Sequence, residues 1–267
     1  MAIETLSTSD SASEFFRKLN ANFGECKNDN LYNGMKMVSL GDSITYGYVP
    51  RNHPDYVPNQ NTQLPSYAAL TAQLLGMSFV NYGITGSSVS VIAGQNRNPM
   101  CNRISDMDSD ADVITFMGGT NDVTNGVELG TFSDRVNTTF YGALHAVMQG
   151  LYTRYIAGQS VDMADGKKRK IVVCTPIKLL NPTDGGSLYN WRGFIEAIKE
   201  VAAYYSFPVC DMYNMSLINP HLDRTLQGYT TGYTGLYNKY VPDGTHPTEE
   251  GHEMMADLLV GFLKSLK

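Results

Sequence analysis

The sequence predicts an α/β protein, a three-layer α/β/α sandwich built on a five-stranded parallel sheet. Five short runs rich in β-branched and apolar residues alternate with segments of helical character, and this alternation implies right-handed crossovers between parallel strands. Three of these runs end directly in glycine and polar residues, which is typical of the edge where open α/β sheets carry their active sites. With 267 residues and 42 % apolar content, the chain can bury a full core in one domain.

The expected elements follow in order along the chain. Strands are predicted near residues 37–40, 77–83, 113–117, 171–174 and 209–212, where apolar runs are bounded by turn residues. Helices are predicted near residues 66–75, 132–155 and 189–205, with a last one beginning just after His246. Residues 84–110 are expected to be mostly loop or broken helix.

An N-terminal element is expected ahead of this alternating part. A capping-box pattern at Ser11 and Glu14 precedes apolar residues at helical spacing, and Gly24 ends the run. We therefore divide the chain into residues 1–30, a polar segment with a short helix, and residues 31–267, a single α/β domain.

Four short motifs carry the functional information. They are GDSIT at 41–45, NYGITG at 81–86, GTND at 119–122 and DGTHP at 243–247. Each motif alone is weak, because Gly, Asp, Ser, Asn and Thr are the common residues of turns. The first three follow predicted parallel strands, so they are expected at one edge of one sheet, and the fourth opens the final helix.

In this order the motifs resemble those of SGNH hydrolases, the GDSL-type esterase and lipase superfamily, whose marker residues are a Ser, a Gly, an Asn and a His. The resemblance implies that Ser43 is the nucleophile, His246 the base and Asp243 the residue that orients the base. It also implies an oxyanion hole made by the amides of Ser43 and Gly86 and the side chain of Asn121, and a flavodoxin-like strand order.

These roles also make physical sense. A serine hydroxyl is a poor nucleophile until an imidazole accepts its proton, and a carboxylate fixes the tautomer of that imidazole. The tetrahedral intermediate of acyl transfer carries a negative oxygen, which needs preorganised hydrogen-bond donors. Asp42, Thr45 and Asp122 also match the family motifs, and we expect these short polar side chains to bond local backbone.

Other site types are disfavoured. The chain lacks GxSxG, GxGxxG and GxxxxGK[ST] motifs, so neither an α/β-hydrolase elbow nor a nucleotide site is indicated, and we expect no cofactor. Aspartates alternate over residues 106–112, but the glycine and glutamate of a calcium loop are missing. No zinc pattern emerges from the cysteines: Cys174 and Cys210 are expected to be buried and reduced, and a bridge between Cys26 and Cys101 stays open.

We therefore predict a metal-independent serine ester hydrolase that works through an acyl-enzyme. The loop over residues 46–65 is interpreted as one wall of the substrate site. Polar loops rich in Tyr, Asn and Gly favour a short acyl group such as acetyl on a carbohydrate or another small ester, although the tyrosines near 229–240 could equally fasten a loop. The alternatives are a lipid-ester or thioester hydrolase, and a non-catalytic glycan-binding or assembly module. His53, His145, His221 and His252 receive no catalytic role, and His221→Ala is expected to be near neutral.

Charge and hydropathy limit the partners. A formal net charge of −6 and a pI near 5.3 argue against nucleic-acid binding, which needs a basic surface. The sequence contains neither a stretch long and apolar enough to span a membrane nor a signal-peptide pattern. We expect a soluble protein acting on a small-molecule or glycan ester, with its compartment and oligomeric state left open.

Overall fold

One sheet organises the molecule. The computed structural model describes residues 30–49, 56, 63–157, 169–179, 188–220 and 239–266. The strands are β1 (Lys36–Gly41), β2 (Ser78–Gly83), β3 (Val113–Met117), β4 (Lys170–Cys174) and β5 (Val209–Cys210). All four pairings are parallel and the order is β2-β1-β3-β4-β5, which confirms the predicted five-stranded, flavodoxin-like sheet.

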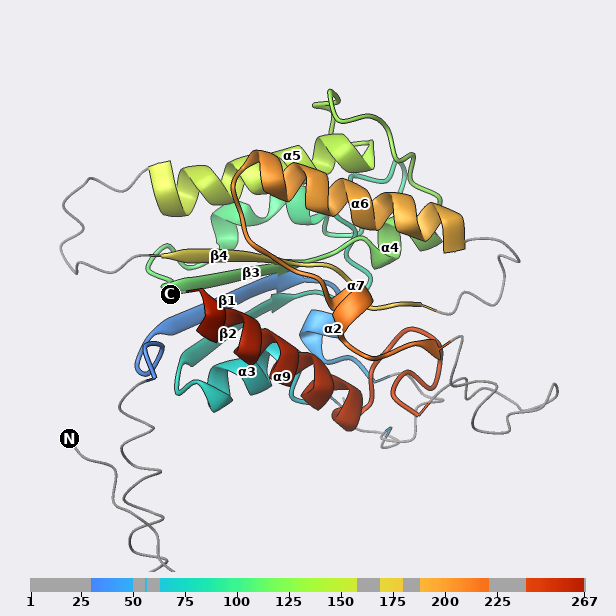
Figure 1. The fold of residues 1–267 in the computed structure, drawn as a ribbon. Coiled ribbons are helices and arrows are strands. Elements are labelled where there is room, and N and C mark those ends of the chain that lie inside the picture. Colours follow the sequence, from blue (N-terminus) through green and yellow to red (C-terminus); the bar gives the residue numbers. More distant parts are fainter. Residues whose placement is uncertain are drawn as a thin grey trace, which may run out of the picture.

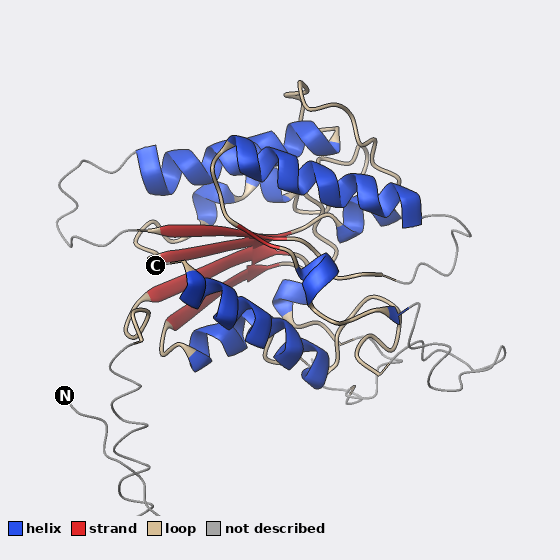
Figure 2. Cartoon of the chain, in the orientation of Figure 1, coloured by secondary structure: helices blue, strands red, loops and turns tan. Residues whose placement is uncertain are grey.

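Helices cover both faces of the sheet (Figures 1 and 2). Helices α5 (Phe140–Tyr152) and α6 (Leu188–Tyr204) lie on one face, and α3 (Tyr67–Leu74) and α9 (Glu249–Ser265) on the other. The central strand β3 is buried on both sides, and four of its five residues are accordingly apolar. Ile114 and Phe116 join the core beneath α5 and α6, whereas Val113 and Met117 join the core beneath α3 and α9. The predicted three-layer sandwich is therefore confirmed.

Short helices begin directly after three of the strands. Helix α2 (Ser43–Tyr46) follows β1, α4 (Thr120–Thr124) follows β3, and α7 (Met212–Met215) follows β5. Because the strands are parallel, these helix starts lie at the same edge, here called the carboxyl edge. The predicted positions of Ser43 and Asn121 at this edge follow directly from the topology.

Two predicted boundaries were wrong. Helix α5 begins at Phe140 and not near residue 132, because the Thr139 side chain accepts the amide of Gly142 and so caps the helix there. The helix then continues as one π-helical turn over Thr153–Ala157. Strand β5 ends at Cys210 and not at Met212, because Asp211 accepts the amide of Asn214 and starts α7.

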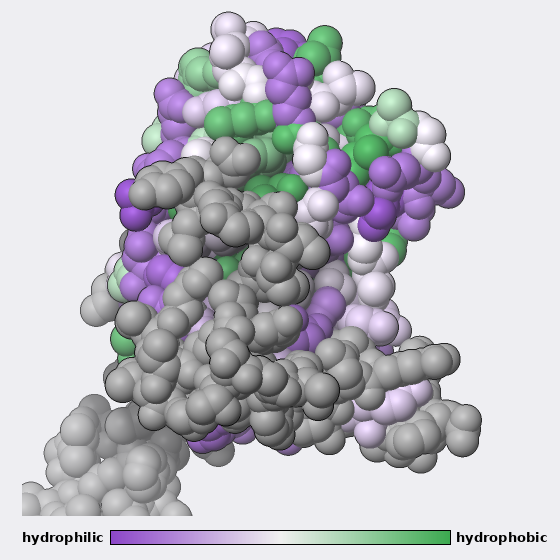
Figure 3. Space-filling model, turned by 90° about the vertical axis from the view of Figure 1, so that its right-hand side faces the viewer, coloured by the Kyte–Doolittle hydropathy of each residue, from purple (hydrophilic) through white to green (hydrophobic). Residues whose placement is uncertain are grey.

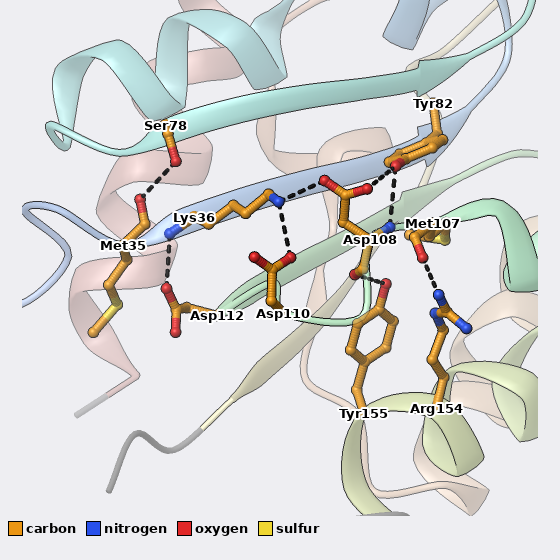
Figure 4. A network of polar contacts seen from close by, with 10 residues as sticks. All are labelled: Met35, Lys36, Ser78, Tyr82, Met107, Asp108, Asp110, Asp112, Arg154 and Tyr155. Carbon is orange, nitrogen blue, oxygen red and sulfur yellow. Dashed lines mark hydrogen bonds and ion pairs between the residues drawn. The ribbon is translucent and has the colours of Figure 1, made fainter. Parts of the chain in front are cut away.

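The opposite edge of the sheet, the amino edge, is held by an ion cluster (Figure 4). The Lys36 ammonium lies 2.5 Å from Asp108 Oδ2 and 2.8 Å from Asp110 Oδ1. Asp112 Oδ2 accepts the Lys36 amide at 2.8 Å, and Tyr82 donates its hydroxyl to Asp108 at 2.7 Å. The alternating aspartates of the sequence thus fasten the start of β1 to the segment before β3, and a lysine lies between two of their carboxylates.

Several further predictions concern single residues. Cys174 and Cys210 lie opposite one another on β4 and β5, and both are buried free thiols, as expected. Cys26, His53, His221 and the N-terminal segment 1–29 lie outside the described residues, so the division of the chain at residue 30 stays a prediction. None of the helices within the described ranges combines the length and hydrophobicity that crossing a bilayer requires.

Candidate active site

The turn between β1 and α2 presents Ser43. Asp42 is the N-cap of α2, and its Oδ1 accepts the amide of Ile44 at 2.9 Å. Ser43 is the first helical residue and only 4 % of it is exposed. The turn requires glycine at position 41, because a Cβ there would lie 2.0 Å from Thr45 Oγ1. Sequence and local geometry together fix the hydroxyl of Ser43 at the carboxyl edge.

The segment before α9 brings His246 and Asp243 to the same point. His246 Nε2 lies 2.9 Å from Ser43 Oγ, although the two residues are 203 positions apart in the chain. His246 Nδ1 lies 2.6 Å from Asp243 Oδ2. Thr248 caps α9 by accepting the amide of Gly251, and α9 packs on α3. The three side chains predicted as a triad therefore form one continuous row of hydrogen bonds.

Asp243 is prepared to remain ionised. Its Oδ1 accepts the amides of Thr245 at 2.9 Å and His246 at 2.7 Å. Burial by itself would raise the pKa of Asp243, but its hydrogen bond to His246, the charge of that ring and the two amides outweigh burial and hold the pKa below its ordinary value. An ionised Asp243 accepts the proton on Nδ1, which leaves Nε2 as the acceptor for the Ser43 hydroxyl.

Ser87 connects two of the predicted oxyanion donors, Gly86 and Asn121. Asn121, in the first turn of α4, donates Nδ2–H to the Ser87 carbonyl at 2.9 Å. This bond uses one of its two amide hydrogens and fixes the orientation of the side chain. The neighbouring Gly86 has φ = +78°, a conformation that favours glycine. Among the described residues, no acceptor is found for the backbone amides of Ser43 and Gly86.

Buried carboxylates hold the backbone around these donors. Asp122 accepts the amides of Val89 and Ser90, both at 2.8 Å, and so anchors the loop that follows Gly86. Burial raises the pKa of Asp122, although these hydrogen bonds oppose the shift, and burial raises the pKa of Asp42 to about 6. The expected backbone contacts of Asp42 and Asp122 are confirmed. Thr45 instead pairs its hydroxyl with that of Tyr67 at 3.2 Å.

Arg103 is a residue that sequence reasoning missed. It is buried, with 9 % exposed, and it donates to the carbonyls of Gly41, Tyr82 and Asn98 and to Ser87 Oγ, at 3.3, 2.9, 2.9 and 2.9 Å. Burial lowers its pKa. One guanidinium thus ties the end of β1, the end of β2 and the Gly86 loop together. No motif marks it, because it lies in a segment that the sequence shows only as irregular.

Two tyrosines receive different places. The ring of Tyr48 meets that of His246 edge-on at 5.2 Å between centroids, so the beginning of the 46–65 loop does reach the site. Tyr240 packs against the core beneath α3 and α9. Tyr229, Tyr233 and Tyr237, the other members of the predicted tyrosine group, lie outside the described residues.

The carboxyl edge faces the viewer in Figure 3, and hydrophilic and hydrophobic residues are mixed over its described part.

A family model, GDSL-like lipase/acylhydrolase, matches residues 39–254. All four motifs lie within this range. The chain belongs to this family. It is accordingly a serine ester hydrolase, as the sequence predicted.

Solved structures show the same fold at low sequence identity. A protein from Lactobacillus plantarum is 24 % identical, with a TM-score of 0.65 over 88 % of this chain and 99 % of its own. A possible lipase from Chitinophaga pinensis is 20 % identical, with a TM-score of 0.59 over 87 % and 98 %. The aryl esterase of M. smegmatis is 16 % identical, with a TM-score of 0.57 over 88 % and 100 %. No curated protein matches the chain.

Proposed function

We propose that this hydrolase removes short acyl groups, such as acetyl, from a carbohydrate or another small ester, with Ser43, His246 and Asp243 as its catalytic triad. The observation that carries the proposal is the 2.9 Å contact between Ser43 Oγ and His246 Nε2, backed by Asp243 at 2.6 Å from Nδ1. The base lies within hydrogen-bond reach of both the nucleophile and the orienting carboxylate, which is the geometric requirement for this chemistry.

Acylation proceeds as follows. His246 Nε2 accepts the proton of Ser43 as Oγ attacks the ester carbonyl, and a tetrahedral oxyanion forms. The amides of Ser43 and Gly86 and the second Nδ2–H of Asn121 bind that oxygen. Protonated His246 then gives its proton to the departing alcohol oxygen, the bond from carbon to that oxygen breaks, and the acyl group remains on Ser43.

Deacylation repeats these steps with water. His246 accepts a proton from water, the resulting hydroxide attacks the acyl carbonyl, and a second oxyanion occupies the same donors. Collapse of this intermediate returns the proton from His246 to Ser43 Oγ and releases the carboxylic acid. Every step uses only protein side chains, backbone amides and water.

The preference for a small polar substrate rests on the residues around the nucleophile. The described side chains beside Gly86 and Asn121 include those of Asn125 and Arg97, which are polar and only partly buried. Polar groups at this place suit the hydroxyls of a sugar better than a long alkyl chain, which requires apolar walls. A lipid-ester or thioester hydrolase is the alternative within the family.

A chromogenic ester series from acetyl to long acyl tests the proposal. We expect kcat/KM to fall with chain length, and Ser43→Ala to lower kcat by about 10³-fold or more. Ser78→Ala, an exposed serine at the amino edge, is the matched control and should retain full activity. Preference for long chains would replace the short-acyl assignment by the lipid alternative. Full activity in Ser43→Ala would refute the triad, and binding without turnover would favour a glycan-binding module.

A further inference from the structure

Arg97 is a cation fixed beside the predicted oxyanion hole. Its Nε donates to Gln95 Oε1 at 2.7 Å, and its Nη2 donates to Asn125 Oδ1 at 2.8 Å. The third nitrogen, Nη1, lies near Gly86, since a Cβ built on that glycine would lie 3.6 Å from it. The guanidinium therefore stands next to the residue whose amide is a proposed oxyanion donor.

Two features keep this guanidinium in place. Asn125 donates its Nδ2 to the carbonyl of Asn121 at 2.7 Å, so Arg97 is connected to the first turn of α4. The next residue along the chain, Asn98, accepts Ser87 Oγ at 2.7 Å and Arg103 Nε at 2.9 Å through its carbonyl. Arg97 thus bridges the two proposed donor elements, and both ends of the bridge are anchored.

The charge of Arg97 is not neutralised locally. Both of its hydrogen-bond partners are neutral amide oxygens, and among the described residues no carboxylate forms an ion pair with it. Its side chain is half-buried, and Nη1 has no hydrogen-bond partner within the described ranges. An arginine held by neutral groups, with free N–H donors beside the proposed oxyanion hole, is suited to bind an anion.

We propose that Arg97 binds a carboxylate carried by the ester substrate close to the scissile carbonyl. This inference rests on the proposed function and narrows its substrate class from small polar esters to anionic ones. The carboxylate can belong to the alcohol part, as in a uronic acid, or to the acyl part, as in a half-ester of a dicarboxylic acid. In both cases Arg97 acts on specificity and leaves the chemistry at Ser43 unchanged.

Two pairs of chromogenic esters test the inference and separate the two sources. On the acyl side, 4-nitrophenyl hemisuccinate is compared with 4-nitrophenyl butyrate. On the alcohol side, 3-carboxy-4-nitrophenyl acetate is compared with 4-nitrophenyl acetate. The ratio of kcat/KM between native protein and variant is taken for each ester, so that intrinsic reactivity cancels.

Arg97→Gln should lower kcat/KM for one of the two anionic esters by about 10- to 100-fold, mainly through KM, because a charge-assisted hydrogen bond is lost. The neutral esters should change by less than about 3-fold. Arg97→Lys keeps the positive charge but loses the forked guanidinium geometry, so its kcat/KM for the anionic ester should lie between those of the native protein and Arg97→Gln. Lys264→Gln, an equal charge change at the far end of α9, is the control and should alter no ester selectively.

An equal loss on neutral and anionic esters would overturn the inference and indicate that Arg97 supports the oxyanion or the fold. No loss on any ester would overturn it as well. If Arg97→Gln does not fold, the inference is tested with Arg97→Lys and with the native protein. The preference of the native protein for an anionic over a neutral ester must weaken as salt is added. If the Arg97 variants show no selective loss while turnover still depends on Ser43, only the inference about Arg97 is wrong and the proposed function stands. Full turnover in Ser43→Ala would refute both the proposed function and the inference.

Discussion

The two edges of the sheet handle charge in opposite ways. At the amino edge, the Lys36 ammonium meets the carboxylates of Asp108 and Asp110 directly, in partly exposed ion pairs. At the carboxyl edge, two buried charges are bound by neutral groups instead. Arg103 donates to three carbonyls and one hydroxyl, and Asp122 accepts from two backbone amides. Charges are therefore paired at the amino edge and solvated separately around the proposed oxyanion donors, although Lys199 and Asp211 also form an ion pair beside α7.

The difference follows from what each edge has to do. Exposed ion pairs are screened by water and add little stability, but they are sufficient to fasten a strand end to a loop. Charges solvated by fixed dipoles hold backbone groups in place before the reaction and need no rearrangement when an oxyanion develops. This arrangement requires the burial of charged groups, which costs free energy. A site that only anchors a strand end can avoid that cost by leaving its charges partly exposed.

The largest expected effect compares one substitution at both edges. Asp243→Asn keeps the shape of the side chain but cannot fix the tautomer of His246, so kcat should fall by about 10⁴-fold. Asp108→Asn makes the same chemical change at the amino edge and should leave kcat and KM unchanged. Steady-state kinetics on the preferred chromogenic ester measures both. Similar losses in the two variants would mean that the edges do not differ in function.

The next effect concerns the proposed oxyanion donors. Asn121→Ala removes the side-chain donor and should lower kcat by about 10²- to 10³-fold, with little change in KM, because the donor acts mainly on the transition state. Asn102→Ala, an exposed asparagine in the short 3-10 helix Met100–Asn102, is the matched control and should retain kcat. A rise in KM at unchanged kcat would assign Asn121 to substrate binding instead.

A smaller effect separates positioning from anchoring. Arg103→Gln leaves the carbonyls of Gly41 and Tyr82 without their buried donor, so the loops that hold the proposed oxyanion donors should shift. We expect kcat to fall by about 10-fold or more together with the melting temperature. Lys36→Gln should lower only the melting temperature, and only at low salt. Loss of stability at full kcat in Arg103→Gln would reduce this residue to an anchor like Lys36.

What the sequence could predict depends on the range of the interactions. Strands and motifs were predictable because each is a local pattern: an apolar run such as Val113–Met117 followed by polar turn residues. The positions of Arg97 and Arg103 were not, because their partners are carbonyls and amides gathered from three loops, and no residue pattern encodes such contacts. The start of α5 failed for a related reason: Thr139 competes as a cap with an apolar pattern that begins at Phe132.

The last prediction contrasts the pH dependence of the two edges. Burial raises the pKa of Asp42 from 3.8 to about 6, and the charge of Asp122 adds to the shift. Since the folded protein binds this proton more tightly than the unfolded chain, the stability it contributes is fully present below about pH 4 and is lost as the pH rises through about 6. Ionising Asp42 in the fold therefore costs about 3 kcal/mol.

Asp42→Asn keeps an Oδ1 for the Ile44 amide but cannot ionise, so its stability should lack this decline between pH 4 and 7. Asp108 has the opposite sign: its hydrogen bond to Lys36 lowers its pKa, so its contribution is present at neutral pH and is lost in acid. Denaturant unfolding of Asp42→Asn and Asp108→Asn at a series of pH values measures how the free energy of unfolding of each variant depends on pH. If Asp42→Asn parallels the native protein over this range, Asp42 does not titrate as a buried acid, and the contrast between the edges is limited to geometry.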